Sequence, residues 1–163
     1  SDGMTAKPEY IELSKENYIN EMLATGSLPV LMKNPIKLNN KRKYDGGITD
    51  PLPVKKAYEM GARDITIIRT YEESFIRKTK LENYIAALAT RSHPEISKAI
   101  LFNNVTYNSA LKFIKNPPSD CTIKQICPPH RLKTKRATTN HITMKADYQM
   151  GLKAGQNFLQ KLT

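Results

Sequence analysis

The sequence predicts an α/β fold, and three neighbouring segments carry that prediction. Residues 41–45 are expected to form the second strand of a hairpin, because an Asn-Asn pair before them tolerates the positive φ of a tight turn. Residues 53–60 form a helix with proline at its first position, and Gly61 follows as a C-terminal cap. Residues 65–68, Ile-Thr-Ile-Ile, are typical of a strand covered on both faces in a parallel sheet. Strand, helix and strand in succession predict a βαβ unit.

Apolar periodicity and capping residues predict the remaining elements. These are a helix over 14–25, a helical stretch from Leu81, a helix from Pro94, a strand over 121–127 and a final helix from Thr143. Ser14 and Thr143 are the expected N-terminal caps. The pair Asn103-Asn104 is expected to interrupt the helix that begins at Pro94. Helices therefore surround the short strands, and they dominate the C-terminal part of the chain.

Basic residues are concentrated in the C-terminal part of the chain. The whole sequence contains 26 Lys and Arg residues against 15 Asp and Glu residues, which gives a net charge of +11. From residue 121 to residue 163 the only acid is Asp147. Such a surface attracts polyanions, either nucleic acid or an anionic lipid surface. A basic surface that only keeps the protein soluble is an equal alternative.

The two cysteines indicate a reducing compartment. In an extended strand the Cα atoms of Cys121 and Cys127 would lie about 20 Å apart, at about 3.3 Å per residue, which is beyond the reach of a disulfide. Two free thiols fit a cytoplasmic protein. No apolar run approaches the roughly 18 residues of a membrane span, so any attachment to a membrane is expected to be peripheral.

The histidines and serines form no catalytic or metal-binding pattern. His93, His130 and His141 are dispersed, and none has a second ligand at metal-binding spacing, so neither a metal nor a cofactor is expected. No serine stands in a Gly-x-Ser-x-Gly sequence. The serines are therefore expected to serve as helix caps, turn residues or surface residues.

Asp45 is the first candidate for chemistry. The dipeptide Asp-Gly is common in turns, and alone it predicts only a structural role. Here Asp45 ends a predicted strand, Gly46 and Gly47 follow at once, and residues 50–54 lead into the next helix. Because glycine tolerates positive φ and the close approach of other groups, such a corner can present a carboxylate into a cleft.

The segment around this corner resembles a known enzyme family. Residues 44–54, Tyr-Asp-Gly-Gly-Ile-Thr-Asp-Pro-Leu-Pro-Val, with Gly-Ala-Arg at 61–63, resemble the second catalytic block of the bacterial branch of patatin-like phospholipases. Residues 24–30 are similar to that family's Ala-Ser-x-x-x-Pro segment, with a glycine where serine or alanine is more usual. Residues 1–8 are similar to the strand end and turn that precede it. The resemblance runs through about Thr70 and continues weakly to the C-terminus.

The resemblance implies a fold and an activity. The fold would be the C-terminal part of a three-layer α/β/α sandwich, in which residues 1–70 belong to the catalytic domain and residues 71–163 form a helical, basic region. The activity would be hydrolysis of phospholipid, lysophospholipid or another acyl ester by a Ser-Asp dyad. Asp45 would be the general base, with Gly46 and Gly47 setting its geometry.

The same resemblance implies that half of the site lies outside this sequence. The Gly-x-Ser-x-Gly elbow and the glycine-rich oxyanion loop are absent and would lie upstream of Ser1. The chain alone is therefore expected to be inactive. It is also expected either to bind the missing N-terminal half of the same protein or to associate with itself, because unpaired strand edges and uncovered apolar faces seek partners.

A non-enzymatic alternative stays open. In this interpretation the basic loop at 131–136 binds nucleic acid or an anionic lipid surface, and Asp45 has only a structural role. Nucleic acid is the less favoured partner, because most aromatic residues fall on apolar helix faces, where core packing explains them better than stacking on bases.

Overall fold

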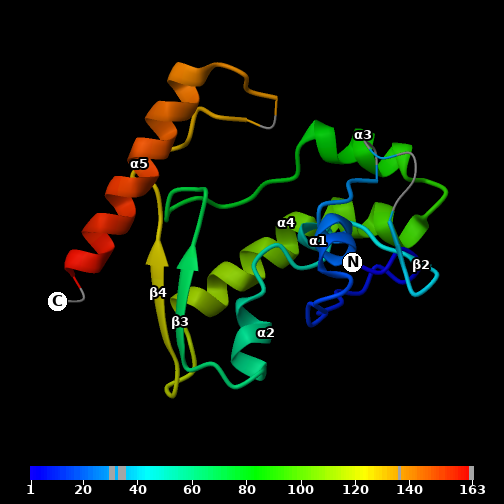
Figure 1. The fold of residues 1–163 in the computed structure, drawn as a ribbon, viewed down its shortest axis with the longest axis horizontal. Helices are drawn as coiled ribbons and strands as arrows, with labels where there is room; N and C mark the ends of the chain where they lie inside the picture. The colour runs from blue at the N-terminus through cyan, green and yellow to red at the C-terminus, as the bar shows by residue number, and fades with distance from the viewer. Residues whose placement is uncertain (30–31, 33–35, 136, 162–163) are drawn as a thin grey trace. The chain divides into compact units, whose positions relative to one another are not determined.

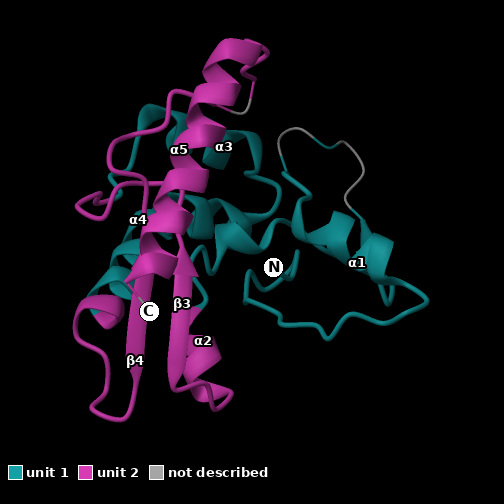
Figure 2. Ribbon diagram, turned by 60° about the vertical axis from the view of Figure 1, so that its left-hand side comes forward, with its two compact units in different colours: residues 1–53, 77–112 teal, residues 54–76, 113–163 magenta. Residues whose placement is uncertain are grey.

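The computed structural model describes residues 1–29, 32, 36–135 and 137–161, and it is a mixed α/β structure with a helical C-terminal region (Figure 1). In chain order the elements are α1 (Tyr18–Thr25), β1 (Lys37–Leu38), β2 (Lys41–Arg42), the 3-10 helix η1 (Gly46–Ile48), α2 (Val54–Glu59), β3 (Asp64–Ile68), α3 (Leu81–Ala89), α4 (Pro94–Lys115), β4 (Thr122–Ile126) and α5 (His141–Gln160). The chain forms two compact units (Figure 2). Unit 1 contains residues 1–53 and 77–112, and unit 2 contains residues 54–76 and 113–163.

The predicted hairpin is present in unit 1. β1 and β2 pair antiparallel, and the turn between them has Asn39 and Asn40 at φ values of 52° and 60°. Asparagine adopts this left-handed conformation more readily than most residues, so the turn prediction is confirmed. Beyond β2, Lys43 forms an isolated antiparallel bridge with Asp2. The N-terminal residues thus extend the hairpin as far as the Asp45 corner.

The core of unit 1 is built on α4. The periodicity that predicted this helix marks its buried side, which in unit 1 contains Ile96, Ile100, Tyr107 and Leu111. Within unit 1, Ile96 and Ile100 cluster with Tyr44 and Ile48, which flank the Asp-Gly-Gly corner. The predicted interruption at Asn103-Asn104 is wrong, because α4 continues through both residues. Asn103 does not compete for its own helix backbone, because its side chain bonds to another segment.

Unit 2 contains a parallel strand pair that replaces the predicted βαβ unit. β3 pairs in parallel with β4, in a register that places Ile65 opposite Ile123. β2 lies in a different two-stranded sheet, so the predicted succession of 41–45, 53–60 and 65–68 into one sheet is wrong. The strand is also not covered on both faces, since Ile65 is buried but Ile68 is 77% exposed. A run of β-branched residues indicates a strand, but it does not specify which strand pairs with it or whether other elements pack on its faces.

Helix ends follow local capping, with two corrections. Gly61 ends α2 with φ 101°, as predicted. α1 begins later than expected, because the hydroxyl of Ser14 accepts a hydrogen bond from the backbone of Asn17 before the helix starts. α5 begins at His141, and its cap is Asn140, whose side chain accepts from the backbone N–H of Thr143 at 3.0 Å.

Several apolar helix faces predicted from periodicity are exposed. The residues concerned are Tyr18, Met22 and Leu23 on α1, Leu81, Tyr84, Ile85 and Leu88 on α3, and Met144, Tyr148, Leu152 and Leu159 on α5. Their exposed fractions lie between 43% and 74%. Leu162, predicted to continue the α5 face, lies outside the described residues. In the described part of the chain, no helix combines the length and apolar character that crossing a membrane requires.

Candidate functional site

Asp45 stands at the corner between β2 and η1 in unit 1. Its backbone N–H donates to the carbonyl oxygen of Ser27 at 2.8 Å. Its side-chain Oδ1 accepts from the backbone N–H of Gly47 at 2.7 Å, so the carboxylate caps η1. The residue is half-buried, and it forms no ion pair with any described residue. The corner therefore holds one carboxylate oxygen in a fixed orientation through the backbone N–H of Gly47.

Gly46 and Gly47 are required for space and not for positive φ. Among the described glycines only Gly61 has a positive φ, so the conformational reason given for this corner is wrong. A Cβ atom on Gly46 would lie 3.2 Å from Oγ1 of Thr25. A Cβ atom on Gly47 would lie 3.1 Å from Oδ1 of Asp45. The two glycines let neighbouring side chains approach the turn closely.

Asn103 of α4 fixes the far side of the corner. Its Nδ2 donates to the carbonyl oxygens of Gly47 at 2.7 Å and Ile48 at 2.9 Å. Its Oδ1 accepts from Nη1 of Arg77, whose guanidinium lies 4.1 Å from the ring centroid of Tyr107. Asn103 is only 8% exposed, so this amide is a buried polar clamp. The sequence analysis did not identify Asn103 as part of the site. Its position at helical spacing between the apolar residues Ile100 and Tyr107 could have indicated a buried polar side chain.

The hydroxyl groups near the corner do not bond to the Asp45 carboxylate. Ser1 donates its hydroxyl to the backbone oxygen of Asp45 at 2.8 Å and lies 2.6 Å from Oγ1 of Thr49. Ser27 is fully buried, and its hydroxyl has no hydrogen-bond partner among the described residues. Neither Ser1 nor Ser27 therefore presents its hydroxyl to the carboxylate oxygens of Asp45.

A buried ion cluster supports the strand that leads into the corner. Lys43 is 6% exposed, and its ammonium pairs with Glu9 and, at 3.4 Å, with Asp2. The backbone N–H of Thr5, with that of Met4, holds the pKa of Asp2 at about 2, below its ordinary value of 3.8. The cluster fastens the N-terminal segment to the hairpin.

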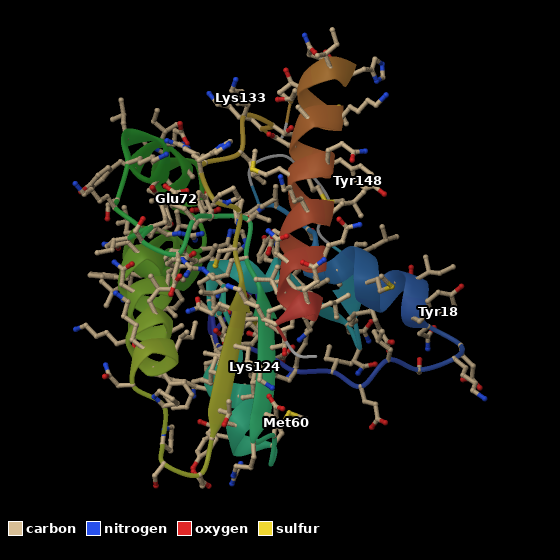
Figure 3. All side chains as sticks on the ribbon, turned by 90° about the vertical axis from the view of Figure 1, so that its left-hand side faces the viewer. Tyr18, Met60, Glu72, Lys124, Lys133 and Tyr148 are labelled. Atoms are coloured by element: carbon tan, nitrogen blue, oxygen red, sulfur yellow. The ribbon has the colours of Figure 1, made fainter. Side chains whose placement is uncertain are left out.

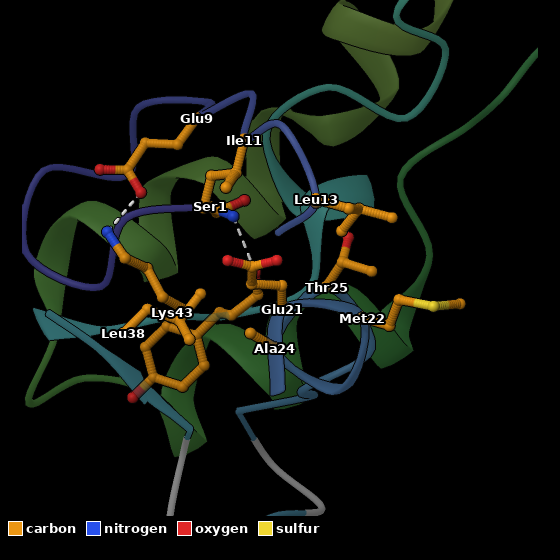
Figure 4. A pocket seen from close by; sticks show the side chains of 12 residues that line it. Ser1, Glu9, Ile11, Leu13, Glu21, Met22, Ala24, Thr25, Leu38 and Lys43 are labelled. Carbon is orange, nitrogen blue, oxygen red and sulfur yellow. Dashed lines mark hydrogen bonds and ion pairs between the residues drawn. The ribbon is translucent and has the colours of Figure 1, made fainter. Parts of the chain in front are cut away.

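An apolar cavity of about 240 Å³ opens beside the corner (Figure 4). It is lined by Ser1, Glu9, Ile11, Leu13, Glu21, Met22, Ala24, Thr25, Leu38, Lys43, Tyr44 and Gly46. Its acids are already engaged, since Glu21 accepts from the backbone and hydroxyl of Ser14, and Glu9 pairs with Lys43. The surface that remains for a ligand is mainly apolar.

Unit 2 has a second group of polar residues at the carboxyl ends of β3 and β4. Arg69 is 5% exposed and donates to Oε1 of Gln125 at 2.9 Å and to backbone oxygens of Glu72 and Glu73. Burial raises the pKa of the Cys127 thiol, although the charge of Arg69 opposes this. A thiol of raised pKa is a poor nucleophile at neutral pH.

Cys121 and Cys127 are both free, as predicted. His93 lies 3.1 Å from Arg42 and packs edge-on against Tyr44, so it belongs to the hairpin contacts. The described residues contain no group of three His, Cys, Asp or Glu side chains that could hold a metal ion.

Comparison with known proteins gives two matches. A family model described as a domain of unknown function (DUF6363) matches residues 93–163. The uncharacterized protein YjjU of Escherichia coli (strain K12) is 26% identical over 153 residues, which cover 93% of this chain and 43% of that protein. The chain thus spans less than half the length of this curated relative. No solved structure matches.

These matches overturn the resemblance to patatin-like phospholipases. Neither the domain of unknown function nor the uncharacterized relative indicates that family, so the assignment is wrong. The resemblance was misleading because Asp-Gly and Gly-Gly pairs are common in sharp turns of many unrelated proteins. The structure is a mixed α/β arrangement, and its described residues form two short two-stranded sheets.

Proposed function

We propose that this chain supplies the general base, Asp45, of an acyl ester hydrolase whose hydroxyl nucleophile lies outside the chain. A carboxylate within hydrogen-bonding reach of a hydroxyl can remove its proton and so activate it for attack on an ester. Asp45 is suited to this role, because one oxygen is oriented by Gly47 and no described side chain forms an ion pair with it. The proposal rests on the geometry of the corner and not on a family.

The observation that carries the proposal is the clamp from Asn103 to the corner. An ordinary surface turn needs no buried amide from a distant helix. Here Asn103 satisfies two carbonyl oxygens of η1 and is itself fixed by Arg77. Such support holds a side chain in one geometry before substrate binds, which is what a base needs in order to act.

The cavity beside the corner supports an acyl substrate. Its apolar residues, Ile11, Leu13, Met22, Ala24 and Leu38, suit a hydrocarbon chain. Lys43 in its lining is already paired with Glu9. The substrate class in this proposal is an ester of phospholipid or lysophospholipid.

The remainder of the site would come from additional chain. The curated relative is more than twice as long as the matched part, which leaves room for a nucleophile and an oxyanion loop. The proposal includes a larger α/β/α sheet in which strands from that additional chain pair with the free edges of β3 and β4.

The test uses the longest natural protein that contains this chain. Its hydrolysis of a short-chain nitrophenyl ester and of phosphatidylcholine is compared between the native protein and Asp45→Asn. Asp50→Asn is the matched control, because Asp50 is close in sequence and also half-buried. We expect a loss of about 100-fold or more for Asp45→Asn and near-native rates for the control. Equal rates for native protein and Asp45→Asn would remove Asp45 from the mechanism.

A further inference from the structure

α5 carries an apolar stripe whose side chains remain largely exposed. The stripe consists of Met144, Tyr148, Leu152 and Leu159, which are 43%, 64%, 44% and 62% exposed. Their spacing of four and seven residues places them on one side of the helix. Figure 3 shows Tyr148 on the outer side of α5. We call this set the α5 stripe.

A different face of α5 attaches the helix to unit 2. That face contains the buried or half-buried residues Thr143, Asp147, Met150, Ala154 and Phe158. At 3.6 residues per turn it lies about a third of a turn from the α5 stripe. The stripe therefore leaves exposed apolar area that is available to a partner.

The exposed surface of α5 carries cations and no acid. Lys145 and Lys153 are exposed, and Lys145 lies next to the α5 stripe. Asp147 is the helix's one acid; it is 8% exposed, and its Oδ2 accepts from the backbone N–H of Thr134 at 2.6 Å. That bond also fixes the preceding loop, which presents Lys133 to solvent (Figure 3).

We propose that the α5 stripe binds the surface of an anionic lipid bilayer, with α5 lying in the plane of the interface. Apolar residues beside lysines are the pattern of helices that insert shallowly into such a surface. Lys145, which lies next to the stripe, adds an electrostatic attraction to anionic headgroups. This proposal does not depend on Asp45, and it would bring an ester hydrolase to its phospholipid substrate if the proposed function holds.

Two other partners fit the same surface less well. The phosphates of a nucleic acid would contact the lysines, but the four apolar side chains of the α5 stripe would make no contribution to that binding. A second copy of the chain would cover the apolar residues, but the exposed surface of its α5 offers no acid to pair with Lys145. An anionic bilayer is the partner that matches both the apolar stripe and the charge.

Co-sedimentation of the 163-residue chain with vesicles tests the proposal. The vesicles contain phosphatidylcholine with or without phosphatidylserine. We expect binding to the anionic vesicles that weakens with salt, and a loss of about tenfold or more for Leu152→Glu with Tyr148→Glu. The matched control is Leu81→Glu with Tyr84→Glu on α3, where both residues are comparably exposed. The control is expected to bind as the native chain does, and circular dichroism verifies that each variant is folded.

A fluorescence measurement tests the proposal with a conservative substitution, so that its result does not depend on a variant that could unfold. The sequence contains no tryptophan, so Tyr148→Trp introduces a single reporter on the α5 stripe. Its emission is expected to shift to shorter wavelength with anionic vesicles, whereas Tyr84→Trp on α3 should not respond.

Three results would overturn the proposal. One is equal loss of vesicle binding in the α3 control. Another is a change from dimer to monomer in the stripe variant with no change in vesicle binding, which would indicate a second copy. The third is salt-sensitive binding to DNA in the absence of any vesicle binding.

Discussion

The side-chain nitrogen of Asn103 lies 2.7 Å from the carbonyl oxygen of Gly47, and this contact joins the middle of α4 to the Asp-Gly-Gly corner. The same nitrogen donates to Ile48, and Arg77 donates to the amide oxygen. A residue expected to break a helix instead leaves it intact and fixes a turn that is remote in sequence. The position of the Asp45 carboxylate therefore depends on α4 as well as on the turn itself.

Asn103→Ala is expected to destabilise the chain by about 1–3 kcal/mol, because two carbonyl oxygens lose a buried donor. Urea unfolding measures this change. Asn104→Ala is the control, since Asn104 is the neighbouring residue and is only half-buried, and it should cost much less. Equal destabilisation by both changes would show that the clamp contributes nothing specific. In the longer protein, Asn103→Ala should lower kcat more than it alters KM.

Gly47→Ala is expected to disturb the Asp45 carboxylate directly. The new Cβ would lie 3.1 Å from Oδ1 of Asp45, so the carboxylate has to move by a few tenths of an ångström and its bond to the Gly47 N–H weakens. The midpoint of thermal unfolding should fall. Gly151→Ala should have the opposite sign and stabilise α5 by about 0.5–1 kcal/mol, because no atom lies within 4 Å of its added Cβ. A rise in the unfolding midpoint for Gly47→Ala would contradict the steric account.

The stability of the chain should depend on pH through Asp2. Its pKa is about 2 in the folded protein and near 3.8 when unfolded, because the backbone of Thr5 and Met4 hydrogen-bonds to the charged form. A lowered pKa means that the stabilisation is present above about pH 4 and is lost as the pH falls towards 2. The difference corresponds to about 2 kcal/mol. Unfolding free energies measured across this range should show a smaller fall with pH for Asp2→Asn, and an unchanged fall would rule out Asp2 as its source.

The isolated chain is expected to associate with itself in the absence of additional partners. Ile19 and Leu23 on α1 are 57% and 53% exposed, and aggregation of such surfaces is driven by the burial of apolar area. Ile19→Lys with Leu23→Lys should shift the chain towards monomer in sedimentation velocity. Thr106→Lys adds a charge at an exposed polar position of α4 and should leave association as it is. A native chain that is already monomeric would refute this expectation.

Part of the fold followed directly from local sequence. The Asn39-Asn40 turn, the Gly61 cap and the buried stripe of α4 were predicted correctly, because positive φ and helical periodicity are properties of the residues themselves. The strand between Cys121 and Cys127 was also predicted correctly, and both cysteines are free.

Asp45 itself was identified as a candidate from its neighbours in sequence, but its surroundings were not. The sequence suggested that Gly46 and Gly47 are needed for their backbone conformation. In the structure they instead leave space for the side chains of Thr25 and Asp45. The cavity residues come from the N-terminal segment, α1 and the hairpin, so no single stretch of sequence indicated them.

What the sequence determined by itself was therefore the set of turns, caps and periodic faces, since each depends on residues that are near one another in the chain. Tertiary structure decided that β3 pairs with β4, that Asn103 holds the corner, and that the apolar residues of α5 remain exposed. These features depend on which distant segments meet. The free energy of such contacts belongs to pairs of segments and is not contained in either segment alone.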